Sequence, residues 1–156
     1  MTKTLLVIAL SISAPYAEAG EVASQQTIRA GTQPSRSGPA AYFTGRVRVE
    51  PFFQSDEDIQ ASAASVTFES SARSAWHTHP AGQRLLVTSG AGLTQEWGKP
   101  VQALYPGDVV VCPPGVKHWH GAMPDRAMTH LAVTGVRDGK TVDWMEKVDD
   151  DQYFSR

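Results

Sequence analysis

Hydrophobic and polar side chains alternate along much of the chain after Tyr42. At residues 64–68, for example, Ala64, Val66 and Phe68 fall on one face, as alternate residues of a strand do. Similar short runs recur between Gly- and Pro-containing turns. We expect strands at residues 46–49, 64–68, 74–79, 84–88, 92–97, 101–104, 109–112, 117–121 and 127–134. Many short strands separated by such turns predict an all-β sandwich or barrel.

The C-terminal tail has a less regular pattern. Residues 141–148 fit either a strand or a short helix, and we expect a strand followed by a helical turn. The three aspartates at 149–151 are then most simply a solvated tail.

The N-terminal residues are expected to be removed from the working protein. Lys3 precedes an apolar run at residues 5–12, and an A-x-A cleavage motif ends at Ala19. Because a membrane span needs about 20 apolar residues, we interpret residues 1–19 as a secretory signal peptide. The mature protein is therefore expected to be exported, to the periplasm or the medium, with no part in the membrane.

Two further segments complete the predicted organisation. Residues 20–40 are rich in Ser, Gln, Thr, Gly and Pro, which predicts a flexible linker or arm. Part of this arm could instead cross to a partner subunit as an edge strand. Residues 41–156 have the length of one domain.

Charge and cysteine content exclude several classes of protein. The net charge is −2 and no run of Lys or Arg occurs, so nucleic acid is not an expected partner. Cys112 is the only cysteine, which leaves no disulfide within the chain. Its place in the apolar run 109–112 favours a buried small hydrophobe.

Four of the five histidines form two H-x-H pairs. His77 and His79 share a face of their strand, with the amide oxygen of Gln83 four residues further on. The second pair, His118 and His120, is expected to supply a fourth donor. Such convergent neutral donors predict a divalent metal site.

Two tryptophans alternate with these histidines. Trp76 and Trp119 must therefore point away from the metal. We expect them to pack in a second layer or at a subunit interface.

The two histidine segments resemble the paired motifs of the cupin superfamily, whose fold is a small double-stranded β-helix or jelly-roll barrel. The first motif is matched by His77, His79, Gln83 and Gly90. Ser71 replaces its leading Gly and Gln83 its usual Glu. The second motif is matched by Gly107, Pro113, Gly115 and His118. Ala122 stands where that motif usually has Asn. The resemblance implies a single-domain cupin barrel.

A narrower resemblance concerns the small bacterial cupins that include manganese-dependent hydroxynitrile lyases. It is carried by Y-F-T-G at residues 42–45, W-H-T-H-P-x-G-Q, P-P-G-x-K-H-W-H-G, A-M-T-H ending at His130, and V-D-W-M-E-K-V at residues 142–148. Those enzymes cleave (R)-cyanohydrins such as mandelonitrile to an aldehyde and cyanide. By matched position, the implied metal ligands are His77, His79, Gln83 and His118. His130 would be an active-site histidine beside them.

These residues suggest two roles in the site, metal binding and proton transfer. The proposed ligands are uncharged, so a divalent ion would keep its full charge and act as a strong Lewis acid. Manganese is our first choice, with iron, nickel, cobalt or zinc possible. His130 or His120 would act as the general base, or would instead orient a ligand through a hydrogen bond.

The same inward strand face suggests the substrate pocket. Ala64, Val66 and Phe68 would form an apolar wall for a small-molecule substrate, or serve only as core. Cupins of this size commonly pair, so a homo-oligomer, a dimer or tetramer, is also expected.

Three other functions remain open at this level. They are an oxygenase resembling quercetin dioxygenase, a decarboxylase or isomerase of small keto acids, and a cupin that binds metal or a small molecule without catalysis.

Overall fold

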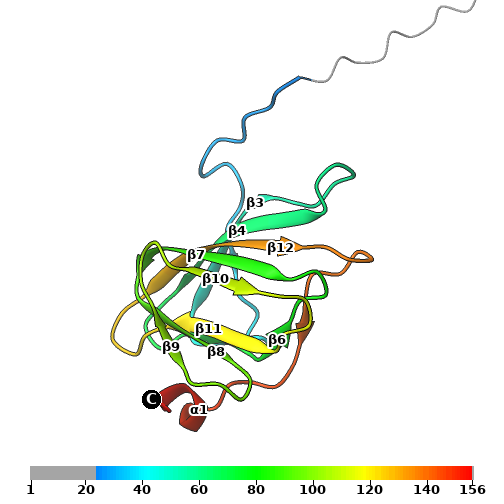
Figure 1. Cartoon of the computed structure of the whole chain (residues 1–156). Coiled ribbons are helices and arrows are strands. Elements are labelled where there is room, and N and C mark those ends of the chain that lie inside the picture. Colours follow the sequence, from blue (N-terminus) through cyan, green and yellow to red (C-terminus); the bar gives the residue numbers. More distant parts are fainter. Residues whose placement is uncertain (1–23, 156) are drawn as a thin grey trace, which may run out of the picture.

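The structure, a computed structural model, describes residues 24–155. Within them, two antiparallel sheets face each other and curl into a short barrel (Figure 1). The six-stranded sheet contains, in spatial order, β1 (Arg36–Ser37), β3 (Val47–Phe53), β4 (Ala61–Phe68), β12 (Met128–Gly135), β7 (Gln83–Gly90) and β10 (Val109–Cys112). We call it sheet A. The prediction of an all-β jelly roll is confirmed.

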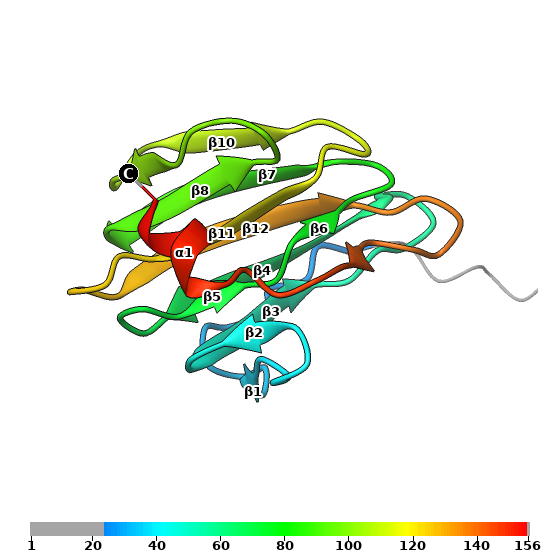
Figure 2. The same ribbon diagram turned by 90° about the horizontal axis from the view of Figure 1, so that it is seen from below.

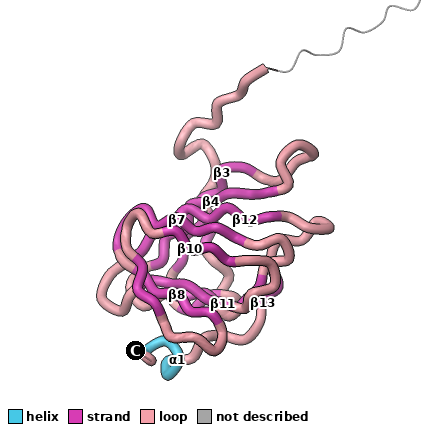
Figure 3. Tube along the Cα trace, in the orientation of Figure 1, coloured by secondary structure: helices cyan, strands magenta, loops and turns pink. Residues whose placement is uncertain are grey.

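The second sheet, sheet B, has seven strands. Its main path contains β13 (Asp143–Trp144), β6 (His77–Thr78), β11 (His118–Ala122), β5 (Arg73–Ser74) and β2 (Phe43–Thr44). On the other side of β11 lie β8 (Gly92–Glu96) and then β9 (Gln102–Leu104). The only helix among residues 24–155 is α1 (Asp150–Phe154), drawn in cyan in Figure 3. In this part of the chain, no helix is long and apolar enough to span a membrane.

Each segment expected as a strand contains one, but the segment at 74–79 is interrupted. Arg73 pairs with Gly121, and His77 pairs with His118. The segment from residue 73 to residue 77 is therefore one residue longer than the part of β11 that it faces. The extra residue is a bulge, because the backbone of Trp76 bonds to the tail instead: its N–H donates to the carbonyl of Glu146. A one-residue shift exchanges the two faces of a strand. His77 therefore points into the barrel, whereas Arg73 points outward.

The N-terminal part of the domain adds an edge strand to its own sheet. β1 pairs with β3, with Arg36 opposite Val49. β1 thus lies in the last part of the segment expected to be an arm. The signal peptide expected at residues 1–19 lies outside the described residues, and the proposed domain limits remain predictions.

Two apolar clusters lie on opposite faces of sheet B. One fills the barrel and consists of Val47, Val66, Phe68, Ala72, Val87, Leu104, Ala122 and Met128. The other lies outside the sheet and consists of Trp76, Leu93, Trp119, Val148 and Tyr153. Figure 2 shows α1 and the tail crossing this outer face. Trp76 and Trp119 therefore form the second layer that their positions predicted.

The three aspartates of the acidic tail are exposed, as expected, and two of them also make structural contacts. The Asp149 side chain caps α1 by accepting a hydrogen bond from the Gln152 backbone N–H at 2.7 Å. The Asp150 carboxylate accepts one from Arg73 Nη2 at 2.6 Å. Arg73 is 5% exposed, and a buried guanidinium needs a partner of opposite charge. The tail therefore holds the outer layer against sheet B.

Candidate metal centre

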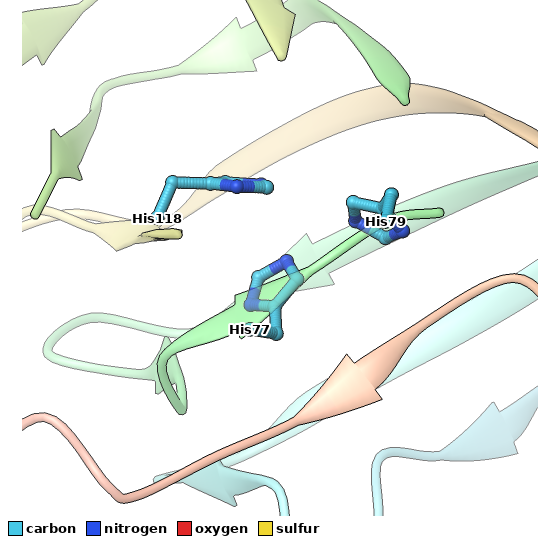
Figure 4. Close-up of side chains that lie close together, drawn as sticks. All are labelled: His77, His79 and His118. Atoms are coloured by element: carbon cyan, nitrogen blue, oxygen red, sulfur yellow. The ribbon is translucent and has the colours of Figure 1, made fainter. Parts of the chain in front are cut away.

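Three histidines meet where β6 and β11 run side by side. His77 lies directly opposite His118 in the strand register, and their ring centroids are 4.3 Å apart. His79, just beyond β6, points to the same place, as Figure 4 shows. One ring nitrogen of each residue lies within 4.8 Å of those of the other two. The spacing of the H-x-H pair thus becomes a three-histidine cluster.

A tight turn after His79 brings Gln83 back to the same region. The Gly82 N–H donates to the carbonyl of His79, and Gly82 has φ +82°. A Cβ atom at this glycine would lie 2.8 Å from the Cys112 carbonyl oxygen. Only glycine meets both demands without strain. The turn therefore lets β7 begin at Gln83, next to the histidines.

Backbone carbonyls fix the orientation of each clustered imidazole. His77 Nδ1 lies 2.9 Å from the Ala75 oxygen. His79 Nδ1 lies 2.6 Å from the Thr141 oxygen and His118 Nδ1 lies 3.0 Å from the Val116 oxygen. Because a carbonyl oxygen can only accept, each Nδ1 must carry the proton. Each Nε2 then presents its lone pair, as in protein metal sites.

Several buried polar atoms at this place have no hydrogen-bond partner in the described part of the chain. They include His79 Nε2, His118 Nε2 and Gln83 Oε1. Buried polar atoms without partners are costly and rare. All three atoms are electron-pair donors, so one cation would satisfy them together. The residues present therefore fit a divalent metal ion, held by nitrogen and oxygen ligands.

Burial keeps the clustered imidazoles neutral. It lowers the pKa of His77 well below the usual value, and the neighbouring His118 lowers it further. Burial likewise lowers the pKa of His118 to about 4. The pKa of His79 is also lowered by burial, against a smaller opposing effect of the Thr141 carbonyl. At pH 7 these rings need not release a proton before they bind a metal.

The same pKa shifts predict how the stability of the metal-free protein depends on pH. The pKa values of His118 and His130 are about 4 in the folded state, against 6.5 for an ordinary histidine. Between these values the unfolded chain binds protons that the folded chain excludes. We expect the free energy of unfolding to fall as the pH drops from 6.5 toward 4. Urea unfolding with a chelator present measures it.

A matched variant separates this effect from the titration of carboxylates. His130→Gln removes one of the shifted groups, so its free energy of unfolding should fall less steeply over the same pH range. Parallel pH profiles for the two proteins would contradict the assignment.

His120 and His130 lie deeper in the barrel, beside the cluster. His130 sits in β12 opposite Val66 of β4, and neither of its ring nitrogens has a hydrogen-bond partner in the described residues. Its ring centroid is 4.9 Å from that of His120, which in turn is 5.2 Å from that of His77. Burial lowers the pKa of His130 to about 4. His130 is thus a neutral imidazole without a structural hydrogen bond.

An apolar cavity of about 190 Å³ opens beside these histidines. Its wall includes the three predicted residues Ala64, Val66 and Phe68 together with His77, His79, Gln83, His120 and His130. The structure therefore places the predicted pocket residues beside three of the four predicted metal ligands, while His118 contacts the cluster from outside this wall.

The cavity wall also includes residues that the sequence pattern did not single out. Trp144 of β13 lies with its ring centroid 4.9 Å from that of His77 and stacks on Tyr42 at 4.8 Å. Thr134 of β12 also lines the cavity, as do Phe43, Thr141 and Val142. Thr134 lies on the same face of β12 as His130 because side chains alternate along the strand. Its place in the cavity wall could therefore have been predicted from the sequence. For Trp144 and Val142, the motif V-D-W-M-E-K-V indicated the resemblance but did not indicate that these side chains line the cavity.

A larger cavity of about 460 Å³ lies between β10 and β8–β9 and touches His118. Its wall contains Glu96, Asp108 and Cys112 but neither His77 nor His79. It therefore lies on the other side of the cluster from His130. Cys112 is buried, as expected, and burial raises the pKa of its thiol to about 11.

Comparisons with known proteins agree with this fold. The family model described as "Cupin domain" matches residues 64–134. The chain is 57% identical over 125 residues to "(R)-mandelonitrile lyase" of Granulicella tundricola, covering 80% of this chain and 95% of that protein.

Solved structures similar to this chain are also cupins. A cupin-like protein from Thermotoga maritima is 39% identical, with a TM-score of 0.72 over 75% of this chain and 89% of that one. A cupin-2 domain protein from Rhodospirillum rubrum is 20% identical, with a TM-score of 0.63 over 83% and 90%. The second match supports the fold alone. The chain belongs to the cupin family and, by its identity with a lyase over most of its length, is an enzyme of the lyase class.

Proposed function

We propose that the protein is a metal-dependent hydroxynitrile lyase that cleaves, or forms, small (R)-cyanohydrins such as mandelonitrile. The observation that carries the proposal is the cluster of unpartnered Nε2 and Oε1 atoms beside an apolar cavity that also holds the unbonded His130. The 57% identity with an enzyme named for mandelonitrile supports the substrate class.

The proposed ligands are His77, His79, Gln83 and His118. An ion held by these four uncharged groups would supply Lewis acidity and an uncompensated positive charge beside the cavity. The Nδ1 hydrogen bonds of the three histidines keep their lone pairs turned to this point. The chain thus contributes a rigid, neutral ligand set.

The apolar wall binds the carbon skeleton of the substrate. Ala64, Val66 and Phe68 leave room for a small aromatic or aliphatic group and exclude water from it. Their position beside the histidines directs the polar hydroxyl and nitrile of a cyanohydrin toward the metal ligands. This arrangement favours a compact neutral substrate.

His130 is the proposed proton carrier, with His120 as the nearest alternative. The neutral ring accepts the hydroxyl proton of the cyanohydrin as the O–H bond breaks, while the C–C bond to the nitrile breaks and a carbonyl forms. Cyanide leaves with the bonding electron pair and takes the proton back from the ring. The reaction is redox-neutral and returns His130 to its starting state.

Three finer features belong to this proposal. Manganese is the metal we favour, before iron, nickel, cobalt or zinc, because mixed nitrogen and oxygen ligands suit all of them and the resemblance favours manganese. Export after cleavage near Ala19 is the proposed location. A homo-oligomer is supported by exposed aliphatic side chains on sheet A, at Leu86, Val109 and Val111.

A cyanide-release assay tests the proposed function. We expect purified protein from residue 20 onward to release cyanide from (R)-mandelonitrile at mildly acidic pH. Release should stop after chelation and return when a divalent metal is restored. Metal-loaded protein that releases no cyanide would contradict the proposal. Oxygen uptake with a flavonol would favour an oxygenase instead.

A further inference from the structure

Thr134 lies directly opposite Gln83 across the pairing of β12 with β7. Both residues are buried, at 8% and 7% exposure. Gln83 Nε2 donates a hydrogen bond to Thr134 Oγ1 at 3.0 Å, while Gln83 Oε1 is buried without a partner in the described residues. The two ends of one amide therefore have different surroundings.

Those surroundings matter because an amide has two ends of nearly equal shape. The oxygen binds a cation, whereas the NH₂ group cannot. Packing alone hardly distinguishes the two orientations, so a specific hydrogen bond has to do so. The free lone pair of His79 Nε2 offers the NH₂ group a competing acceptor in the metal-free site. An amide turned that way would occupy the site with a donor.

The Gln83 amide is close enough to His79 for this competition. Both side chains line the wall of the same cavity, and the turn at Gly82, whose N–H donates to the His79 carbonyl, separates them by only four residues. Thr134 Oγ1, on the neighbouring strand of sheet A, gives the NH₂ group a different acceptor. The oxygen then stays turned toward the histidines.

We propose that Thr134 is a positioning residue that keeps the Gln83 carbonyl oxygen facing the metal site. The inference rests on the metal site of the proposed function and is independent of the cyanohydrin substrate. It concerns metal affinity, which can be measured without any activity.

Two substitutions at Thr134 test the role of its hydroxyl. Thr134→Val replaces the hydroxyl by a methyl group of similar size, whereas Thr134→Ser keeps the oxygen. We expect Thr134→Val to weaken Mn²⁺ binding by about 10- to 100-fold, measured by titration calorimetry on chelator-treated protein. Thr134→Ser should stay within about 3-fold of the wild type. Equal affinities for all three proteins would overturn the proposal.

A double-mutant cycle separates positioning from packing. In Gln83→Glu the two carboxylate oxygens are equivalent, so rotation of the side chain no longer removes the ligand. We therefore expect Thr134→Val to change Mn²⁺ affinity by less than about 3-fold in that background. An equal loss in both backgrounds would assign Thr134 a packing role and overturn the proposal.

Two controls keep the result interpretable. Thermal unfolding of the metal-free variants verifies that they fold, and Thr134→Ala provides a second variant with the same expected loss. Wild-type protein that binds no divalent ion would overturn both this inference and the metal site. Wild-type protein that binds metal but releases no cyanide would overturn the proposed reaction alone.

Discussion

Replacing His118 by alanine is expected to abolish metal binding and cyanide release together. His118 contributes a buried Nε2 that has no partner within the described chain, and it faces His77 across β11 and β6. Without it, only three proposed ligands remain, and the two histidines among them come from one short segment. We expect metal affinity to fall by at least about 100-fold, since even residues that only orient ligands cost 10- to 100-fold. Metal analysis after dialysis measures the loss.

The control for this variant is another buried histidine of the same barrel. His130→Ala should retain the metal, because His130 is not among the clustered ligands. His118→Ala protein that still carries one metal per chain would refute the proposed ligand set.

The second large effect is expected on turnover rather than on binding. His130→Ala should slow cyanide release by about 10²- to 10⁴-fold, the usual contribution of a positioned acid or base. The amount of bound metal should be nearly unchanged. Steady-state cyanide release and metal content measured on the same preparation provide the comparison. Unchanged turnover would exclude His130 as the base.

The pH dependence of the wild type gives an independent view of His130. Burial lowers the pKa of His130 to about 4, so the ring is neutral above that pH and can accept a proton. Activity carried by His130 is present above pH 4 and is lost as the pH falls through this value. The residual rate of cyanide release by His130→Ala should not show this loss as the pH falls through 4.

The direction of the site's side chains could be predicted from the sequence because side chains in a strand alternate between its two faces. This alternation placed His77, His79 and His118 on the inward face and Trp76 and Trp119 on the outward face, and the structure agrees. Side chains two residues apart share a face whatever the partner strand is. That rule holds without knowledge of the sheet order.

Features that depend on contacts between segments far apart in the chain could not be predicted from the sequence. The bulge between Arg73 and His77 arises because the Trp76 backbone bonds to the tail rather than to β11. Trp144 reaches the cavity through a two-residue strand, too short to leave a periodic signal. The bond between Thr134 and Gln83 depends on the register of β12 against β7. Local propensity says little about such contacts.

The donor atoms come from both halves of the barrel. His77 and His118 belong to sheet B, whereas Gln83 begins β7 of sheet A. An ion bound by all of them would act as a cross-link between the sheets. Binding of the ion would therefore also raise the free energy of unfolding, because it stabilises the folded arrangement in which the two sheets face each other.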